Sequence, residues 1–290
     1  MEGIASLLAP FAEFGFMRRA LAGCVALSVS APLIGVFLML RRMSLVGDAI
    51  QHAILPGAAL GYLVAGLSLG AMTLGGLVAG LAVALLAGLI TRTTNLREDT
   101  AIATFYILSL ALGVTLLTAR GTNVDVLRVL FGSVLALDDA TLLLMTGVSS
   151  ITVLALALFL RPMVLEFADS GFLRSVSAAG GAMHFLFLGL AVLNMVAAFH
   201  ALGTLLSIGI MILPAATARL WTNDLTRLMA SSVAIALASC SVGLVASYHL
   251  ELASGPAIIL VAGCVYMASI LAGRAGGLLP RLIPRRHLEG

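Results

Sequence analysis

Residues 71–91, AMTLGGLVAGLAVALLAGLIT, decide the fold class, because this stretch carries no charged residue and is long enough to cross a bilayer. A membrane-spanning helix needs about 20 predominantly apolar residues. The whole chain has the same character: 61% of its 290 residues are hydrophobic, 10% are charged, and the mean hydropathy is +1.15. Such a composition is typical of an integral membrane protein. We therefore predict an all-α, polytopic membrane protein in which residues 1–290 form a single transmembrane domain.

Further apolar stretches on both sides of this segment predict about nine spans. The sixth and seventh run almost together between His200 and Gly203, and the count is eight if they are one span. We also expect Pro214 to kink the seventh. With nine spans and the N-terminus outside, twelve arginines fall on one side and four on the other, which places the C-terminus in the cytoplasm. The predicted spans are 20–40, 48–66, 71–91, 101–119, 140–160, 183–200, 203–218, 228–247 and 256–273.

An aspartate and a histidine lie in the sequence SLVGDAIQHAILPG at 44–57, within the second span. Asp48 and His52 are four residues apart, so both side chains project from the same face of a helix. Pro56 follows four residues later and removes the hydrogen bond to the carbonyl of His52. A carboxylate, an imidazole and a free carbonyl suit a borderline or hard divalent cation. We predict that Asp48 and His52 contact a metal ion, with further ligands from water, other spans or a second copy of the chain.

A purely structural interpretation also stands, in which an Asp–His hydrogen bond ties helices together. Ionisable side chains at membrane depth are costly and usually mark a path for substrate or ions, which favours the functional interpretation. His200, at the end of the sixth span, is a weaker candidate for a transient metal contact, because an interfacial histidine is more often solvated. Small residues at four-residue spacing on the second span allow a neighbouring helix to approach closely: Ala53, Gly57, Gly61 and Ala65.

The longest predicted cytoplasmic connection is 161–182, RPMVLEFADSGFLRSVSAAGGA. Its mixture of charged and aromatic residues resembles a short amphipathic helix that lies at the membrane surface. A plain connector would be shorter and more polar, so a docking surface for a cytoplasmic partner is an equal alternative. Before it, Asp138 and Asp139 are expected to cap the fifth span. The candidate docking residues are Glu166, Asp169, Phe172 and Arg174.

Several functional classes are excluded by what the sequence lacks. It contains no G-x-x-x-x-G-K-[ST] loop, no HExxH and no GxSxG, so we predict no nucleotide site, no catalytic residues and no permanently bound cofactor. The formal net charge of +3 is small and scattered, which argues against a nucleic-acid partner. The three cysteines are isolated in apolar runs and fit buried small hydrophobes. The basic tail RLIPRRHLEG predicts an anchor on membrane lipid.

Residues 41–62, RRMSLVGDAIQHAILPGAALGY, closely resemble the RRMSLxGDAxSHAxLPG signature of the ABC-3 group of metal-ion ABC transporter permeases. Further matches follow in the family's order: FMRRAL at 16–21, NVDVLRVLFGSVLAL at 123–137 and ALGTLLSIGIMILPAATARLW at 201–221. The sequence departs from the family pattern at Gln51, where serine is common, and at Ser177, which replaces a frequent glycine in the segment that docks on the ATPase.

The resemblance implies the membrane permease subunit of an ATP-driven importer in the bacterial plasma (inner) membrane, carrying a divalent transition metal from periplasm to cytoplasm. It implies a second permease chain, two cytoplasmic ATPase subunits that hydrolyse the ATP, and a periplasmic metal-binding protein. It also implies that Asp48 and His52 contact the metal in transit. The sequence FHALGTLLSIGIMILPA at 199–215 looks most like the manganese/iron branch of the family, which has two different permeases. Mn²⁺ is therefore the favoured ion, with Zn²⁺ or Fe²⁺ as alternatives. The rival class is a secondary transporter or channel that uses Asp48 as a proton-coupled carboxylate; a structural subunit without a pore is a third.

Overall fold

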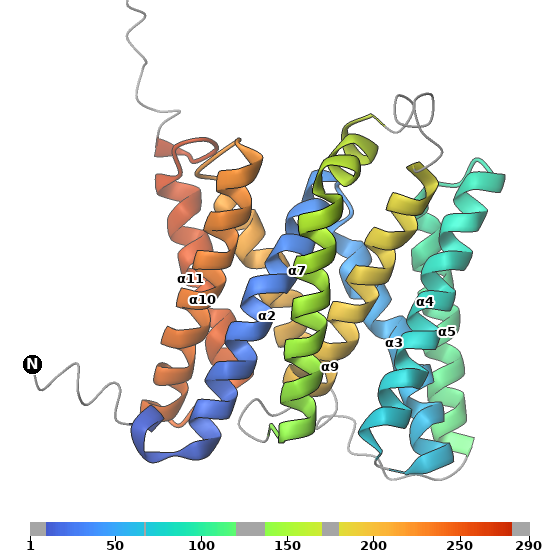
Figure 1. Cartoon of the computed structure of the whole chain (residues 1–290), viewed down its shortest axis with the longest axis horizontal. Helices are drawn as coiled ribbons and strands as arrows, with labels where there is room; N and C mark the ends of the chain where they lie inside the picture. The colour runs from blue at the N-terminus through green and yellow to red at the C-terminus, as the bar shows by residue number, and fades with distance from the viewer. Residues whose placement is uncertain (1–9, 67, 120–136, 170–179, 280–290) are drawn as a thin grey trace, which may run out of the picture.

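The structure is a computed structural model that describes residues 10–66, 68–119, 137–169 and 180–279 (Figure 1). Within these ranges the chain is helical, with short connections and no strand. The prediction of an all-α, multi-pass membrane protein is confirmed. The long helices are α2 (Gly15–Leu40), α3 (Ser44–Ala65), α4 (Leu69–Thr93), α5 (Glu98–Ala119), α7 (Asp139–Ala168), α9 (Gly180–Arg219), α10 (Leu225–His249) and α11 (Ser254–Ala272).

Six helical segments of the described chain are long and apolar enough to cross a membrane. They are α2, Leu69–Ile90 of α4, α7, Gly181–Phe199 of α9, α10 and α11. Thr100–Gly113 of α5 and Leu205–Arg219 of α9 are shorter apolar helices. Each predicted span overlaps a helix or one half of α9, but the number of membrane crossings stays a prediction.

α9 consists of two helices joined at Gly203, whose backbone has φ 77° and ψ 176°. Glycine adopts a positive φ at little cost because it has no Cβ, so the chain can change direction there. The predicted boundary between the sixth and seventh spans therefore corresponds to a break in the helix. Pro214 lies inside the second helix of α9, and the kink expected there stays a prediction.

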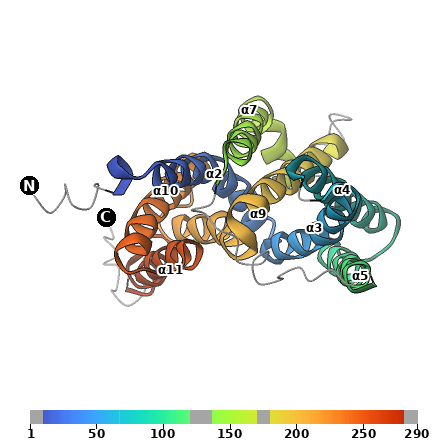
Figure 2. The same cartoon turned by 90° about the horizontal axis from the view of Figure 1, so that it is seen from below.

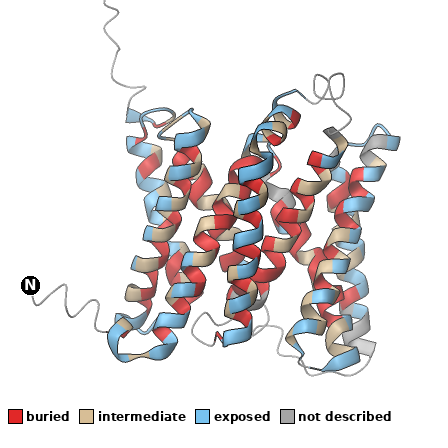
Figure 3. Ribbon diagram, in the orientation of Figure 1, coloured by how far each residue is buried: buried red, intermediate tan, exposed pale blue. Residues whose placement is uncertain are grey.

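The helices stand side by side, and α9 lies at the centre of the bundle (Figures 1 and 2). On one side of α9 are α10 and α11, and on the other are α3, α4 and α5, while α2 and α7 pack along it. Buried residues line the faces between helices, and exposed residues lie on the outside (Figure 3). Many of these exposed residues are large and hydrophobic, such as Leu143, Leu158 and Leu260. An apolar exterior of this kind is what a lipid-facing bundle needs.

The end of α7 differs from the sequence prediction. The helix continues to Ala168, so the first part of the predicted cytoplasmic connection, from residue 161, is helical. The extra turns are held by packing: Met163 is fully buried, and the Phe167 ring lies 5.3 Å from that of Phe37 and 4.9 Å from that of Phe187. Residues 170–179 of the predicted connection lie outside the described part of the chain.

Candidate metal site

α3 places Asp48 and His52 on successive turns of one face. The Oδ1 atom of Asp48 lies 3.6 Å from Nε2 of His52, and their side chains are 52% and 29% exposed. Because the helix begins at Ser44 and rises about 1.5 Å per residue, His52 lies about 12 Å along it. The two side chains thus form one cluster on the flank of α3, open on the side of Asp48. Their role as metal ligands stays a prediction.

The imidazole of His52 is turned so that one nitrogen faces Asp48 and the ring lies against α5. Its ring centroid is 5.9 Å from that of Tyr106, with an angle of 31° between the planes. Nδ1 is buried and has no hydrogen-bond partner among the described residues. Nε2 is therefore the ring nitrogen available beside the carboxylate, the arrangement needed for a shared cation.

α5 forms one wall of the site through two contacts just beyond His52. The Ser109 hydroxyl donates a hydrogen bond of 3.2 Å to the carbonyl of Ala53. A methyl group added at Gly113 would lie 2.8 Å from Cβ of Pro56, so the backbone of α5 crosses α3 at the proline. Pro56 cannot donate a hydrogen bond to the carbonyl of His52, which leaves that oxygen as a third possible ligand.

Two members of the small-residue stripe predicted on α3, Gly57 and Gly61, pack against α4. A Cβ added at Gly57 would overlap the carbonyl oxygen of Gly75, and one added at Gly61 would overlap that of Ala71. The two helices therefore meet backbone to backbone, which only glycine permits. This contact fixes the half of α3 that follows the site.

The third wall is α9, and no local pattern in the sequence predicts this contact. Gln51 lies between the two candidate ligands, is fully buried, and donates a hydrogen bond from Nε2 to the hydroxyl of Ser207. Gly47, one turn earlier, packs against side chains from both halves of α9. In the sequence, Gln51 stands out only as a departure from the family signature. No residue near it in the chain indicates that its partner lies 156 residues away.

The described residues do not complete a metal-ligand set around Asp48 and His52. Over residues 10–66, 68–119, 137–169 and 180–279, no group of three or more His, Cys, Asp or Glu side chains could hold a metal ion. As ligands, Asp48 and His52 would supply two donors, and the prediction that water, other spans or a second copy of the chain provide the rest stays a prediction. His200 lies in α9 three residues before the break, and its side chain is outside the described part.

The candidate docking residues divide into three cases. The Glu166 side chain is buried at 3% exposure, so in this arrangement it does not present a surface to a partner. Asp169 is exposed at the C-terminal cap of α7. Phe172 and Arg174 lie outside the described residues.

The end of α7 is also tied to α2. The guanidinium of Arg41 lies 4.7 Å from the centre of the Phe167 ring, and its Nη1 is 2.9 Å from Nδ1 of His184. Arg41 ends the helix that leads directly into α3. A contact of this kind therefore links the last turn of α7 with the start of the helix that carries the site.

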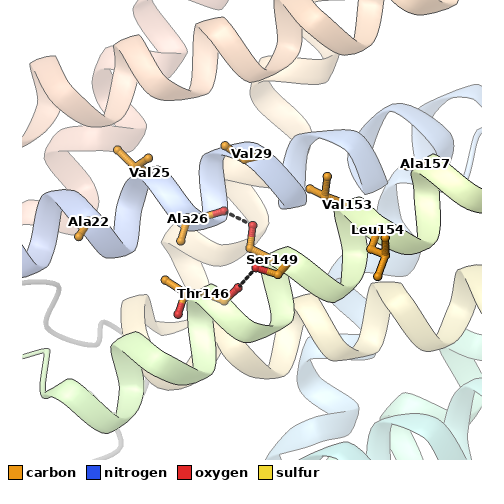
Figure 4. Close-up of a pocket in the computed structure, with 10 residues that line it drawn as sticks. Ala22, Val25, Ala26, Val29, Thr146, Ser149, Val153, Leu154 and Ala157 are labelled. Atoms are coloured by element: carbon orange, nitrogen blue, oxygen red, sulfur yellow. Dashed lines mark hydrogen bonds between the residues drawn. The ribbon is translucent and has the colours of Figure 1, made fainter.

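A separate groove between α2 and α7 has a different chemistry (Figure 4). Its volume is about 700 Å³, and its two polar serines are engaged: Ser149 donates to the carbonyl of Ala26 at 2.6 Å, and Ser150 to that of Thr146 at 2.8 Å. No charged side chain lines it, so it offers a cation nothing comparable to Asp48 and His52. The lining residues are Ala22, Val25, Ala26, Val29, Thr146, Ser149, Ser150, Val153, Leu154 and Ala157.

Comparison with known proteins agrees with the arrangement. The sequence profile of the ABC 3 transport family matches residues 13–273. The chain belongs to this family. It is 31% identical over 270 residues to the manganese transport system membrane protein MntC of Halalkalibacterium halodurans, covering 93% of this chain and 91% of that protein. It is 34% identical over 257 residues to the manganese import system permease protein ScaB of Streptococcus parasanguinis, covering 89% and 90%.

Solved structures share the fold. The structure of PsaBC from Streptococcus pneumoniae in complex with Fab superposes with a TM-score of 0.83 at 30% identity, covering 97% of this chain and 100% of that one. An inward-facing putative metal-chelate type ABC transporter superposes with a TM-score of 0.65 at 17% identity, which shows a common fold alone. The family resemblance found in the sequence is thus confirmed, and the helices that surround Asp48 and His52 belong to an ABC permease fold.

Proposed function

We propose that this chain is the membrane permease subunit of an ATP-driven importer that carries a divalent transition metal, with Mn²⁺ favoured, from the periplasm to the cytoplasm. Family membership and the relatives named for manganese transport support this function. The observation that carries it is the Asp48–His52 pair, a half-exposed carboxylate beside an imidazole in a helix that has no other acidic or basic side chain. The chain resides in the bacterial plasma membrane with its C-terminus in the cytoplasm.

The geometry of the pair suits an ion in transit. The half-exposed carboxylate attracts a cation by its charge and offers it an oxygen donor beside the imidazole nitrogen. Oxygen and nitrogen donors accept Mn²⁺, Fe²⁺ and Zn²⁺ alike, and softness alone does not select one of them. Two protein ligands with one open side hold an ion less firmly than a closed shell does, so it can leave. The open side at Asp48 is completed by water or by the second permease chain.

The energy for transport comes from other chains. Since this sequence has no phosphate-binding loop, separate ATPase subunits bind on the cytoplasmic side, and a periplasmic metal-binding protein delivers the ion. We place the ATPase contact at Asp169 and the residues that follow it, including Phe172 and Arg174. Glu166 supports this end of α7 from inside the bundle.

Uptake of radioactive Mn²⁺ into proteoliposomes that contain the assembled importer tests the site. Asp48→Asn and His52→Ala are each expected to reduce uptake at least tenfold, because each removes one of two protein ligands. Asp139→Asn and His249→Ala are matched controls outside the site, and both should transport normally. Competition by Zn²⁺ and Fe²⁺ ranks the metals.

Normal uptake by both site variants would contradict the assignment of the site. Uptake that continues without ATP and follows a proton gradient would instead support a secondary transporter, in which Asp48 carries the proton.

A further inference from the structure

Gln51 is a buried amide between the two candidate metal ligands of α3. Its side chain has 0% exposure, its Nε2 donates to the hydroxyl of Ser207, and its Oε1 has no partner among the described residues. Burying an unpaired amide oxygen costs more than burying an apolar side chain of similar shape. Packing alone therefore does not favour glutamine at this position.

The partner of Gln51 lies just beyond the break in α9. Ser207 is four residues, about one helical turn, after Gly203, and so it belongs to the second helix of α9. The bond therefore connects the turn that carries Asp48 and His52 to the first part of that second helix.

The same turn of α3 also touches the first helix of α9. A Cβ added at Gly47 would lie 2.9 Å from Cε of Met211, which follows the break, and 3.1 Å from Cε of Met195, which precedes it. Residues 47–52 thus contact α9 on both sides of Gly203. A change of angle at Gly203 would shift these two contacts relative to each other.

Gln51 itself does not face the ion. Consecutive residues of a helix are rotated by about 100°, and His52 is directed toward Tyr106 of α5 while Gln51 is directed toward α9. The amide acts through the backbone of the turn it holds.

We propose that Gln51 is a positioning residue for metal transport: its hydrogen bond to Ser207 fixes the orientation of the Asp48–His52 turn relative to the second helix of α9. The inference rests on the proposed function. The hydrogen bond couples the backbone angle at Gly203 to the geometry of Asp48 and His52. The affinity for the ion therefore depends on a bond in which neither of these two residues takes part.

Two variants remove this bond from opposite sides. Gln51→Met keeps the length of the side chain but has no donor, and Ser207→Ala removes the acceptor. In the reconstituted importer, each is expected to raise the KM for Mn²⁺ about three- to tenfold, the range that corresponds to one net hydrogen bond, with kcat changed less than KM. The double variant should show no further rise, because both changes remove the same interaction. Ser207→Thr retains the hydroxyl and should restore the wild-type KM.

Asn194→Leu is the matched control. This buried amide of α9 donates to the hydroxyl of Thr152 on α7 at 2.7 Å, away from α3. It should lower thermal stability without a change in KM. An unchanged KM in Gln51→Met and Ser207→Ala, or KM effects that add up in the double variant, would overturn the proposal.

The outcome is separable from that of the proposed function. If Asp48→Asn and His52→Ala transport normally, the site itself is wrong. If they abolish uptake while Ser207→Ala has the wild-type KM, only the positioning role fails.

Discussion

The crossing of α3 and α4 predicts that one added methyl group will measurably destabilise the protein. In Gly57→Ala the new Cβ would overlap the carbonyl oxygen of Gly75 and would lie 2.6 Å from Cβ of Ala79. Ordinary carbon contacts begin near 3.4 Å, so the helices must separate by about 1 Å. Overpacking of this kind costs about 1–3 kcal/mol. We expect a cost at the upper end of this range, because a backbone carbonyl cannot rotate away from the new methyl group as a flexible side chain can.

Denaturant unfolding of the purified permease in lipid–detergent micelles measures the effect. Gly147→Ala in α7 is the matched control, because no atom lies within 4 Å of its added Cβ. Replacing an unhindered helical glycine by alanine stabilises by about 0.5–1 kcal/mol, so the two variants should shift in opposite directions. A Gly57→Ala protein as stable as the wild type would refute the close crossing, and with it the rigid support that α4 gives to the site-bearing helix.

Two further predictions concern the ends of α7. The Asp138 carboxylate caps this helix, accepting from the Thr141 backbone N–H at 2.8 Å, so Asp138→Ala should lower stability by about 1 kcal/mol in the same titration. Hydrogen bonds from Thr141 lower the pKa of Asp138, so this advantage is present above the unfolded pKa of about 4 and is lost as the pH falls through the lower folded pKa. A pH-independent difference would contradict the cap. Deleting residues 170–175 should release the ATPase subunits from the permease in a pull-down, and undiminished co-purification would place docking elsewhere.

The helices were predictable from the sequence because membrane spans are decided by local composition. An uncharged stretch such as 71–91 needs no knowledge of its neighbours to be recognised as helical in a bilayer. The cap at Asp138 was equally local, since its partner is three residues away. The i, i+4 spacing of Asp48 and His52 placed them on one face for the same reason.

The end of α7 was not predictable, because hydropathy scores a residue by type and not by its surroundings. Glu166 reads as a surface residue, yet it is buried at 3% exposure. The helix continues there because Phe167 packs against Phe37 and Phe187, residues brought in from α2 and α9. Tertiary packing decides where such a helix ends, and the sequence of the segment alone does not reveal its packing partners.

The exposure of Asp48 indicates which face of the bundle is not covered by lipid. The outward faces of α7 and α11 carry leucines such as Leu154 and Leu260, which can stand in hydrocarbon at no cost. A carboxylate that is 52% exposed on α3 cannot, because an uncompensated charge in the bilayer core costs several kcal/mol. That flank of α3 must therefore meet water or protein. Among the described residues, the same flank also lacks the remaining ligands that a metal shell would need. One covering element, a second permease chain with the ion between the two chains, would meet both requirements.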